Sequence, residues 1–155
     1  MTSDFPAGSL RMSSVQPEAQ LFVDRSLGSC DLCVALRERG LVVHTVASVF
    51  GAREAPTIDD SEWIDHAAQR GWLCLVKDRL HKRPALREAL LRAGAKTFCL
   101  AEQYLQGPDQ IDCFLANLER IIECGREPGP YLYSLYGYEV RRLWPGEGGV
   151  AGPKD

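Results

Sequence analysis

The sequence predicts an α/β fold built on a mainly parallel sheet. Short apolar runs that resemble strands alternate with segments of helical length, which is the pattern of strand–helix–strand units with right-handed crossovers. Glycines stand where these helices should end, at Gly40, Gly71 and Gly94, as expected for helix C-termini. The last segment is different, because two aromatic-rich runs divided at Gly137 favour a terminal hairpin or an extension of the sheet edge.

The elements follow in order from these patterns. Strands are expected at residues 21–24, 41–46, 72–76 and 96–100, and the two hairpin arms at 131–136 and 138–144. Helices are expected at about 29–39, from Asp59 or Asp60 to about 70, at 84–93 and at 109–124. The last helix has apolar residues at helical spacing, namely Ile111, Phe114, Leu115, Leu118, Ile121 and Ile122. A loop is expected through Phe50, Gly51 and Pro56.

Composition predicts one folded domain at residues 20–144. Residues 1–19 and 145–155 are rich in small residues, glycine and proline, and are expected to be a flexible lead-in and tail. The net charge of −3 gives no overall basic signature, so nucleic-acid binding would need a local basic patch. Neither a signal peptide nor a membrane-spanning run is recognisable. A cytoplasmic protein without membrane contact is expected.

The cysteines are expected to be buried thiols in a reducing compartment. They are Cys30, Cys33, Cys74, Cys99, Cys113 and Cys124, and most fall in apolar positions. Cys30 and Cys33 form a CxxC, but neither a second CxxC nor paired histidines follow at zinc-site spacing. A zinc or redox role is therefore disfavoured.

Acidic residues occupy the positions where an open α/β sheet binds ligands. Asp24 and Asp78 each follow an apolar strand, and Asp60 and Glu62 stand at a helix start. Because ligands bind beyond the carboxyl ends of such strands, these acids are expected to converge. A divalent ion such as Mg²⁺ would offset their repulsion and stabilise charge on a scissile phosphate.

We therefore predict a catalytic set of Asp24, Asp60, Glu62 and Asp78, with Asp24, Glu62 and Asp78 as metal ligands. Which of Asp60 and Glu62 serves the metal stays open. For each aspartate alone, helix N-capping is the competing interpretation. Trp63 is expected to anchor its helix in the core rather than to stack on a base.

Basic residues flank these acids and are candidates for binding substrate phosphates. They are Arg25, Lys77, Arg79, Lys82 and Arg83. A solvated basic loop is the alternative, and Arg25 could instead hold a neighbouring carboxylate. The tyrosines of the last segment could stack on single-stranded RNA, but a structural or interface role is preferred.

Three motifs in this order resemble the PIN-like domain family, most closely short prokaryotic members related to VapC-type toxins. They are Phe22-Val23-Asp24-Arg25-Ser26-Leu27-Gly28, Asp60-Ser61-Glu62-Trp63, and Lys77-Asp78-Arg79 followed by Lys82-Arg83-Pro84. The resemblance covers about residues 21–143. It implies a three-layer Rossmann-like fold, RNA cleavage with Mg²⁺ or Mn²⁺, a silencing antitoxin and possible homodimers. The chain departs from many members at Ala101-Glu102-Gln103, which matches no fourth-acid motif.

The function predicted first is a metal-dependent endoribonuclease, the toxin of a toxin–antitoxin pair. One alternative is a PIN-like binding module without catalysis, which the acidic pI of about 5.6 allows. The other is a receiver-like phosphoacceptor domain, which also uses strand-end aspartates with Mg²⁺. That class needs a lysine after a late strand, and none follows strand 96–100.

Overall fold

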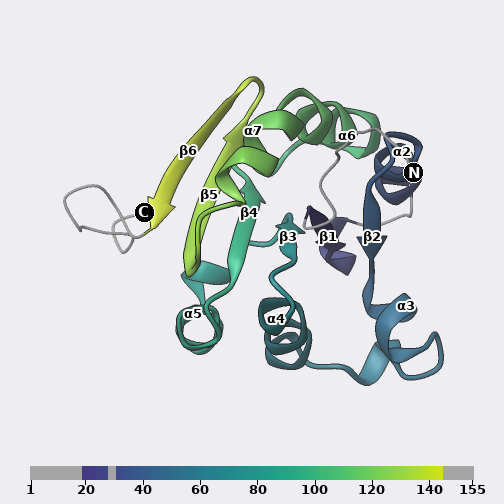
Figure 1. The fold of residues 1–155 in the computed structure, drawn as a ribbon, viewed down its shortest axis with the longest axis vertical. Coiled ribbons are helices and arrows are strands. Elements are labelled where there is room, and N and C mark those ends of the chain that lie inside the picture. The colour runs from purple at the N-terminus through teal and green to yellow at the C-terminus, as the bar shows by residue number, and fades with distance from the viewer. Residues whose placement is uncertain (1–18, 28–30, 145–155) are drawn as a thin grey trace, which may run out of the picture.

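The computed structural model describes residues 19–27 and 31–144. It contains one six-stranded sheet in the order β2-β1-β3-β4-β5-β6 (Figure 1). Neighbouring strands are parallel except β5 and β6, which form an antiparallel pair. The strands are β1 (Gln20–Val23), β2 (Val42–His44), β3 (Leu73–Val76), β4 (Lys96–Leu100), β5 (Tyr131–Tyr136) and β6 (Glu139–Trp144).

Six α-helices and three short 3₁₀ helices connect the strands in the described part of the chain. The α-helices are α2 (Asp31–Glu38), α3 (Val46–Phe50), α4 (Asp60–Gln69), α5 (Pro84–Ala93), α6 (Gly107–Ala116) and α7 (Leu118–Cys124). The 3₁₀ helices are η1 (Arg25–Leu27), η2 (Ala55–Thr57) and η3 (Leu80–Lys82). None of the helices in these two stretches is both long and apolar enough to cross a membrane.

Helices cover both faces of the sheet, which confirms the three-layer α/β architecture (Figure 1). Successive side chains of a strand point to opposite faces, so β1 places Leu21 and Val23 in one core and Phe22 in the other. The first core is closed by α2, α6 and α7, and the second by α3, α4 and α5. Because both faces of the sheet are buried, the sequences of the central strands are nearly continuous apolar runs.

The strand order reverses direction between β1 and β3. The chain leaves β1 for β2 on one side and then returns past β1 to β3, β4 and β5 on the other. Such a switch point opens a crevice beyond the carboxyl ends of the two central strands. Val23 pairs with Leu75, and the amide of Asp24 donates to the Leu75 carbonyl at 3.0 Å. The residues after β1 and β3 are therefore held side by side.

The expectation of right-handed crossovers throughout is wrong for one connection. The β3–α5–β4 and β4–α6–α7–β5 units both move the chain one strand in the same direction. Since α5 packs on one face and α6 and α7 on the other, the two crossovers have opposite hands. Phe114 of α6 and Ile121 of α7 bury their side chains with those of β4 and β5 in the first core.

Most predicted elements are confirmed, and the bounds of α5 and β4 agree with the prediction residue for residue. Gly40, Gly71 and Gly94 have positive φ values of 85°, 70° and 76°, which glycine adopts without steric cost. The described cysteines, Cys33, Cys74, Cys99, Cys113 and Cys124, are all buried as expected. Cys30, residues 1–18 and the predicted tail lie outside the described residues, so the predicted segment boundaries stay predictions.

Two elements differ from the prediction. Residues 46–50, which extend from the end of the predicted strand 41–46 to the start of the loop expected at Phe50, form α3. Thr45 and Ser48 make a capping box at its start: the Ser48 amide donates to Thr45 Oγ1 at 3.1 Å and the Thr45 amide to Ser48 Oγ at 2.8 Å. The predicted helix 109–124 divides at Asn117. The buried side-chain amide of Asn117 donates through Nδ2 to the carbonyl oxygens of Cys113, Tyr136 and Gly137, which connects the helix break to the β5–β6 hairpin.

Candidate active site

An open cleft of about 320 Å³ lies beyond the carboxyl ends of β1 and β3. It is lined by Asp24, Arg25, Ser26, Ile58, Asp59, Asp60, Asp78 and Arg83. Residues from three distant segments therefore meet at the switch point, as the positions of the acids predicted. Three of the four predicted catalytic carboxylates, those of Asp24, Asp60 and Asp78, line this cleft.

Asp24 is the buried member of the set, with only 3 % of its surface exposed. Its Oδ2 accepts a hydrogen bond from the Ser26 amide at 3.2 Å, whereas its Oδ1 has no hydrogen-bond partner in the described structure. Burial raises the pKa of the Asp24 carboxyl, and the charges of Asp60 and Asp78 raise it further, against the bonds from Ser26. A buried oxygen without a partner, beside two other acids, is suited to a cation.

Ser26 fixes the end of β3 against the end of β1. Its Oγ accepts hydrogen bonds from the amides of Lys77 at 3.0 Å and Asp78 at 3.3 Å. Gln103 holds the same turn from the other side, because its Nε2 donates to the Lys77 carbonyl at 2.8 Å. Neither residue was predicted; a serine two positions after a strand-end aspartate was the available signal for Ser26.

Asp60 is positioned by the core beneath α4. Its Oδ1 accepts from Trp63 Nε1 at 2.9 Å, and its Oδ2 lies 3.5 Å from Arg83 Nη2. Trp63 is fully buried, which confirms its predicted role, and stacks on Phe22 with ring centroids 4.9 Å apart. The side chain of Asp60 is thereby oriented by a tryptophan that is itself fixed between helix and sheet.

The helix cap belongs to Asp59 and not to Asp60. Glu62 completes this cap, since its Oε1 accepts a hydrogen bond from the Asp59 amide at 3.0 Å. Glu62 is exposed and is not among the residues that line the cleft. Its predicted role as a metal ligand stays a prediction, and the geometry favours Asp60 as the acid from α4.

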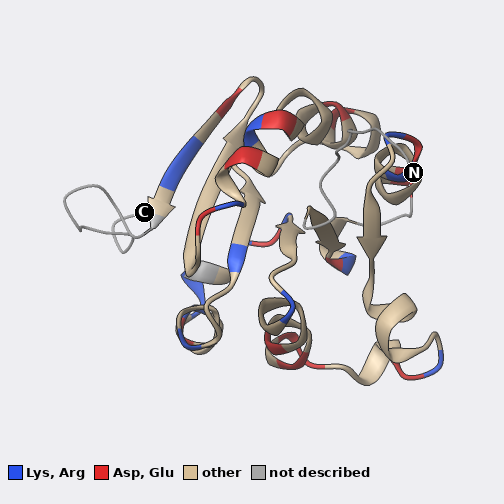
Figure 2. Ribbon diagram, in the orientation of Figure 1, with Lys and Arg blue, Asp and Glu red and all other residues tan. Residues whose placement is uncertain are grey.

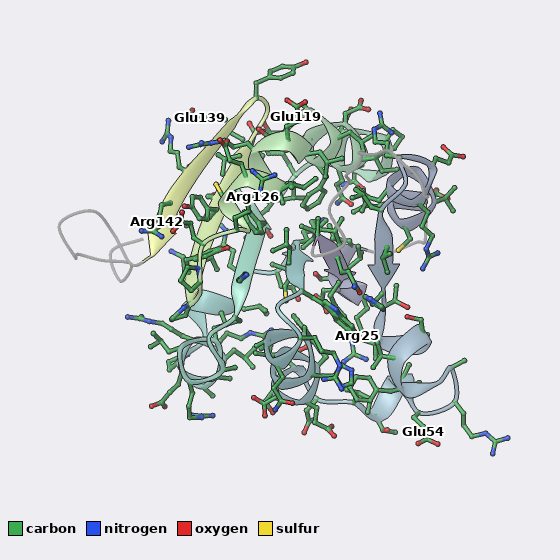
Figure 3. All side chains as sticks on the ribbon, viewed as in Figure 1. Arg25, Glu54, Glu119, Arg126, Glu139 and Arg142 are labelled. Atoms are coloured by element: carbon green, nitrogen blue, oxygen red, sulfur yellow. The ribbon has the colours of Figure 1, made fainter. Side chains whose placement is uncertain are left out.

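The basic candidates divide into two groups. Arg25 and Arg83 line the acidic cleft, and Arg25 reaches from the end of β1 to the carbonyl oxygens of Ala55, at 2.8 Å, and Ile58 (Figure 3). Arg25 thus fixes the segment before α4. Arg79 and Lys82 line a neighbouring pocket, and Lys77 is half-buried outside both.

Asp24, Asp59, Asp60 and Asp78 are the acids that line this cleft in the described structure, and no acid from the segment after β4 joins them. Glu102, the nearest acid after β4, accepts a hydrogen bond from the Tyr104 hydroxyl at 2.9 Å. Within residues 19–27 and 31–144, no group of three His, Cys, Asp or Glu side chains is close enough to bind one metal ion without rearrangement. The donor chemistry nevertheless fits a hard divalent cation, because the carboxylates of Asp24, Asp60 and Asp78 face one cleft and Asp24 Oδ1 is unsatisfied.

Comparison with known proteins agrees with this arrangement. The family model described as "PIN like domain" matches residues 19–102, which contain the four aspartates of the cleft and the switch point. The chain belongs to the PIN-like domain family. A relative named "Putative ribonuclease VapC45", from Mycobacterium tuberculosis (strain ATCC 25618 / H37Rv), is 31 % identical over 124 residues. The alignment covers 79 % of this chain and 90 % of that relative. No solved structure matches the chain.

Proposed function

We propose that this PIN-like protein is a metal-dependent endoribonuclease that hydrolyses phosphodiester bonds of RNA. The observation that carries the proposal is the unsatisfied Oδ1 of buried Asp24, in a cleft that Asp60 and Asp78 also line. The family and the name of the mycobacterial relative support the reaction class. The family match also favours a nuclease over the receiver-like alternative.

The residues that would hold Mg²⁺ or Mn²⁺ are Asp24, Asp60 and Asp78. A divalent cation at such a site supplies Lewis-acid stabilisation of the charge that develops on the scissile phosphate. The protein's contribution is to fix its carboxylates in advance: Ser26 holds Asp24 and the Asp78 turn, and Trp63 holds Asp60. Preorganised ligands need little rearrangement when the substrate binds.

Arg83 and Arg25 would attract and orient the RNA backbone. Both line the cleft with the acids, and arginine makes well-directed contacts to phosphate oxygens. Arg83 pairs with Asp60 across 3.5 Å at a partly exposed position, an interaction of low strength in water. We expect this pair to open when Asp60 turns to a cation and Arg83 to a phosphate.

We further propose that the protein is the toxin of a toxin–antitoxin pair in the cytoplasm. The resemblance of its motifs to VapC-type toxins supports this role, as does the name of the relative. An antitoxin would silence the enzyme by binding at or near the cleft, where two arginines and four aspartates offer charges of both signs. A homodimer is also expected from the resemblance.

Cleavage of a mixed panel of single-stranded and structured RNAs tests the nuclease. The reaction is run with Mg²⁺, with Mn²⁺ and with EDTA, for the wild type, Asp24→Asn and Asp78→Asn. Asp112→Asn, at an exposed position of α6, is the matched control. We expect metal-dependent cutting that is lost in both site variants and kept in the control. Retained cutting in both site variants would refute the assignment of the site.

A binding module without catalysis is the second candidate, and one observation favours it. The described residues show no closed set of three metal ligands, and Asp60 is paired with Arg83. This candidate predicts RNA or partner binding that does not respond to Asp24→Asn, and no binding of Mn²⁺ in calorimetry. Binding of Mn²⁺ by the wild type that Asp24→Asn abolishes would exclude it.

A further inference from the structure

A second pocket, of about 160 Å³, lies beside the acidic cleft at the carboxyl ends of β4 and β5. Its wall includes Arg79 and Lys82 from the turn after β3, and Ser134, Tyr136 and Leu143 from the terminal hairpin. No carboxylate is among the residues that line it. The pocket is therefore basic and partly apolar, in contrast to the cleft next to it.

The turn from Asp78 to Arg83 separates the two hollows. Asp78 and Arg83 line the acidic cleft, whereas Arg79 and Lys82, their immediate neighbours in sequence, line the basic pocket. Arg79 is tied to the pocket floor, because its Nη2 donates to the Ala101 carbonyl at 3.0 Å. A polymer that lies across this turn would contact both sites with successive units.

The ring of Tyr136, which lines the basic pocket, is held in place by a neighbouring arginine. The guanidinium carbon of Arg141 lies 4.6 Å from the centre of its ring, and Arg141 is in turn held by Glu139 at 2.8 Å. Arg141 and its neighbour Arg142 form the basic stretch of β6 visible in Figure 2. The tyrosine ring is half-buried and needs little ordering before a second ring stacks on it.

Two other tyrosines of the hairpin, Tyr131 and Tyr133, have structural roles. Tyr131 is fully buried and Tyr133 packs against the first core, with Phe98 stacked 5.5 Å from the Tyr133 ring. Alternation along β5 places Tyr136 on the opposite face from these two. Among these three tyrosines of β5, Tyr136 is the one that lines the basic pocket, together with the apolar side chain of Leu143.

We infer that the basic pocket binds one nucleotide of single-stranded RNA next to the scissile phosphate. The base stacks on Tyr136 and contacts Leu143, and the adjoining phosphate lies near Arg79 and Lys82. The volume suits one base, since sites for drug-sized ligands reach about 300–1,000 Å³. Bases paired in an A-form helix cannot reach such a pocket, whereas unpaired bases stack readily on aromatic side chains.

The inference rests on the proposed nuclease, and a binding measurement separates the two. Short fluorescent single-stranded RNA is titrated with wild type, Tyr136→Ala, Tyr136→Phe and Tyr138→Ala in EDTA, so that cutting does not interfere. Tyr138 is the matched control, since it lies at the hairpin turn with 91 % of its surface exposed. We expect about tenfold weaker binding for Tyr136→Ala and wild-type binding for Tyr136→Phe and Tyr138→Ala. Circular dichroism confirms that each variant is folded.

Crosslinking locates the nucleotide directly. RNA with 4-thiouridine at single positions is irradiated with wild-type protein, and the crosslinked peptide is identified by mass spectrometry. A crosslink to the β5–β6 hairpin from the position next to the cut site supports the inference. Equal binding by Tyr136→Ala and wild type overturns it, and so does equal loss for single-stranded and duplex RNA of the same sequence.

The two proposals fail in different ways. If the protein cuts RNA but Tyr136→Ala binds and cuts as the wild type does, the pocket assignment is wrong and the nuclease stands. If Tyr136→Ala weakens binding of single-stranded RNA and no RNA is cut under any condition, the nuclease is wrong and the pocket stands as an RNA-binding site. Absence of both binding and cutting overturns both.

Discussion

The hydroxyl oxygen of Ser26 accepts a hydrogen bond from the backbone amide of Asp78 at 3.3 Å, across 52 residues of sequence. The same hydroxyl accepts from Lys77, and the Ser26 amide donates to Asp24. One small side chain therefore connects the two strand ends that carry the acids. This connection sets the relative position of Asp24 and Asp78 before any ligand is bound.

Ser26→Ala should loosen this connection. The amides of Lys77 and Asp78 lose their acceptor, and we expect about 1–3 kcal/mol of lost stability together with weaker Mn²⁺ binding and a lower kcat. Urea unfolding and calorimetry with Mn²⁺ measure these effects. Ser61→Ala, at an exposed position of α4, is the control. Unchanged metal affinity in Ser26→Ala would show that the hydroxyl does not position the acids.

Asp24→Asn should stabilise the metal-free protein at neutral pH. Because burial, with the charges of Asp60 and Asp78, raises the pKa of Asp24, its ionised form disfavours folding. The stability that protonated Asp24 contributes is fully present below its ordinary pKa of 3.8 and is lost as the pH rises through the raised pKa of the folded protein. The advantage of the asparagine variant should therefore be present near pH 7 and vanish below about 3.8.

Thermal unfolding of wild type and Asp24→Asn in EDTA, over this pH range, tests the prediction. Asp65→Asn, on the exposed side of α4, serves as the control and should show no such divergence. A difference between Asp24→Asn and wild type that stays constant with pH would contradict the account of Asp24 as a buried acid with a raised pKa.

Substitutions of Asp60 and Glu62 should have different effects on metal binding and stability. Asp60→Asn is expected to reduce Mn²⁺ affinity and cleavage with little change in stability, because the amide oxygen can still accept from Trp63. Glu62→Ala removes the acceptor of the Asp59 amide and should cost about 0.5–2 kcal/mol of stability, with cleavage retained. The opposite outcome, in which Glu62→Ala abolishes metal binding in a stable protein, would restore Glu62 as the ligand.

Arg83→Ala should act in opposite directions on metal and RNA. Removal of the guanidinium releases Asp60, and we expect Mn²⁺ affinity to rise up to about fivefold, as the strength of a partly exposed ion pair allows. RNA affinity should fall, and the slope of its salt dependence should decrease by about one. Calorimetry and a salt titration of RNA binding measure the two effects. Arg92→Ala, exposed near the end of α5, is the control.

Asn117→Ala should destabilise the terminal hairpin. The substitution leaves carbonyl oxygens of Cys113, Tyr136 and Gly137 without their donor, and a loss of about 1–3 kcal/mol is expected. Hydrogen exchange should then increase in β5 and β6 more than in β1 and β3. If the pocket of Tyr136 depends on this hairpin, single-stranded RNA binding should weaken as well. Exchange that rises equally in all strands would contradict this anchoring role.

The sequence by itself determined the class of fold and most of the elements. Apolar runs and glycine stops define local structure directly, and α5 and β4 follow the prediction to the residue. The convergence of Asp24 and Asp78 was also predictable, since strand ends of a parallel sheet meet at one edge. The capping box of Thr45 and Ser48 could also be recognised in the sequence, and it was overlooked when no helix was predicted at residues 46–50.

Only the tertiary structure decided that Asp60 and not Glu62 lines the cleft, and that Asp59 rather than Asp60 caps α4. Asp59 and Asp60 have the same N-cap propensity, and the orientation of Asp60 depends on the bond from Trp63, whose position is set by stacking on Phe22. The division of the last helix at Asn117 likewise depends on distant hairpin carbonyls. Local propensity gives helices and strands, whereas long-range packing orients individual polar side chains, because their partners lie far apart in the chain.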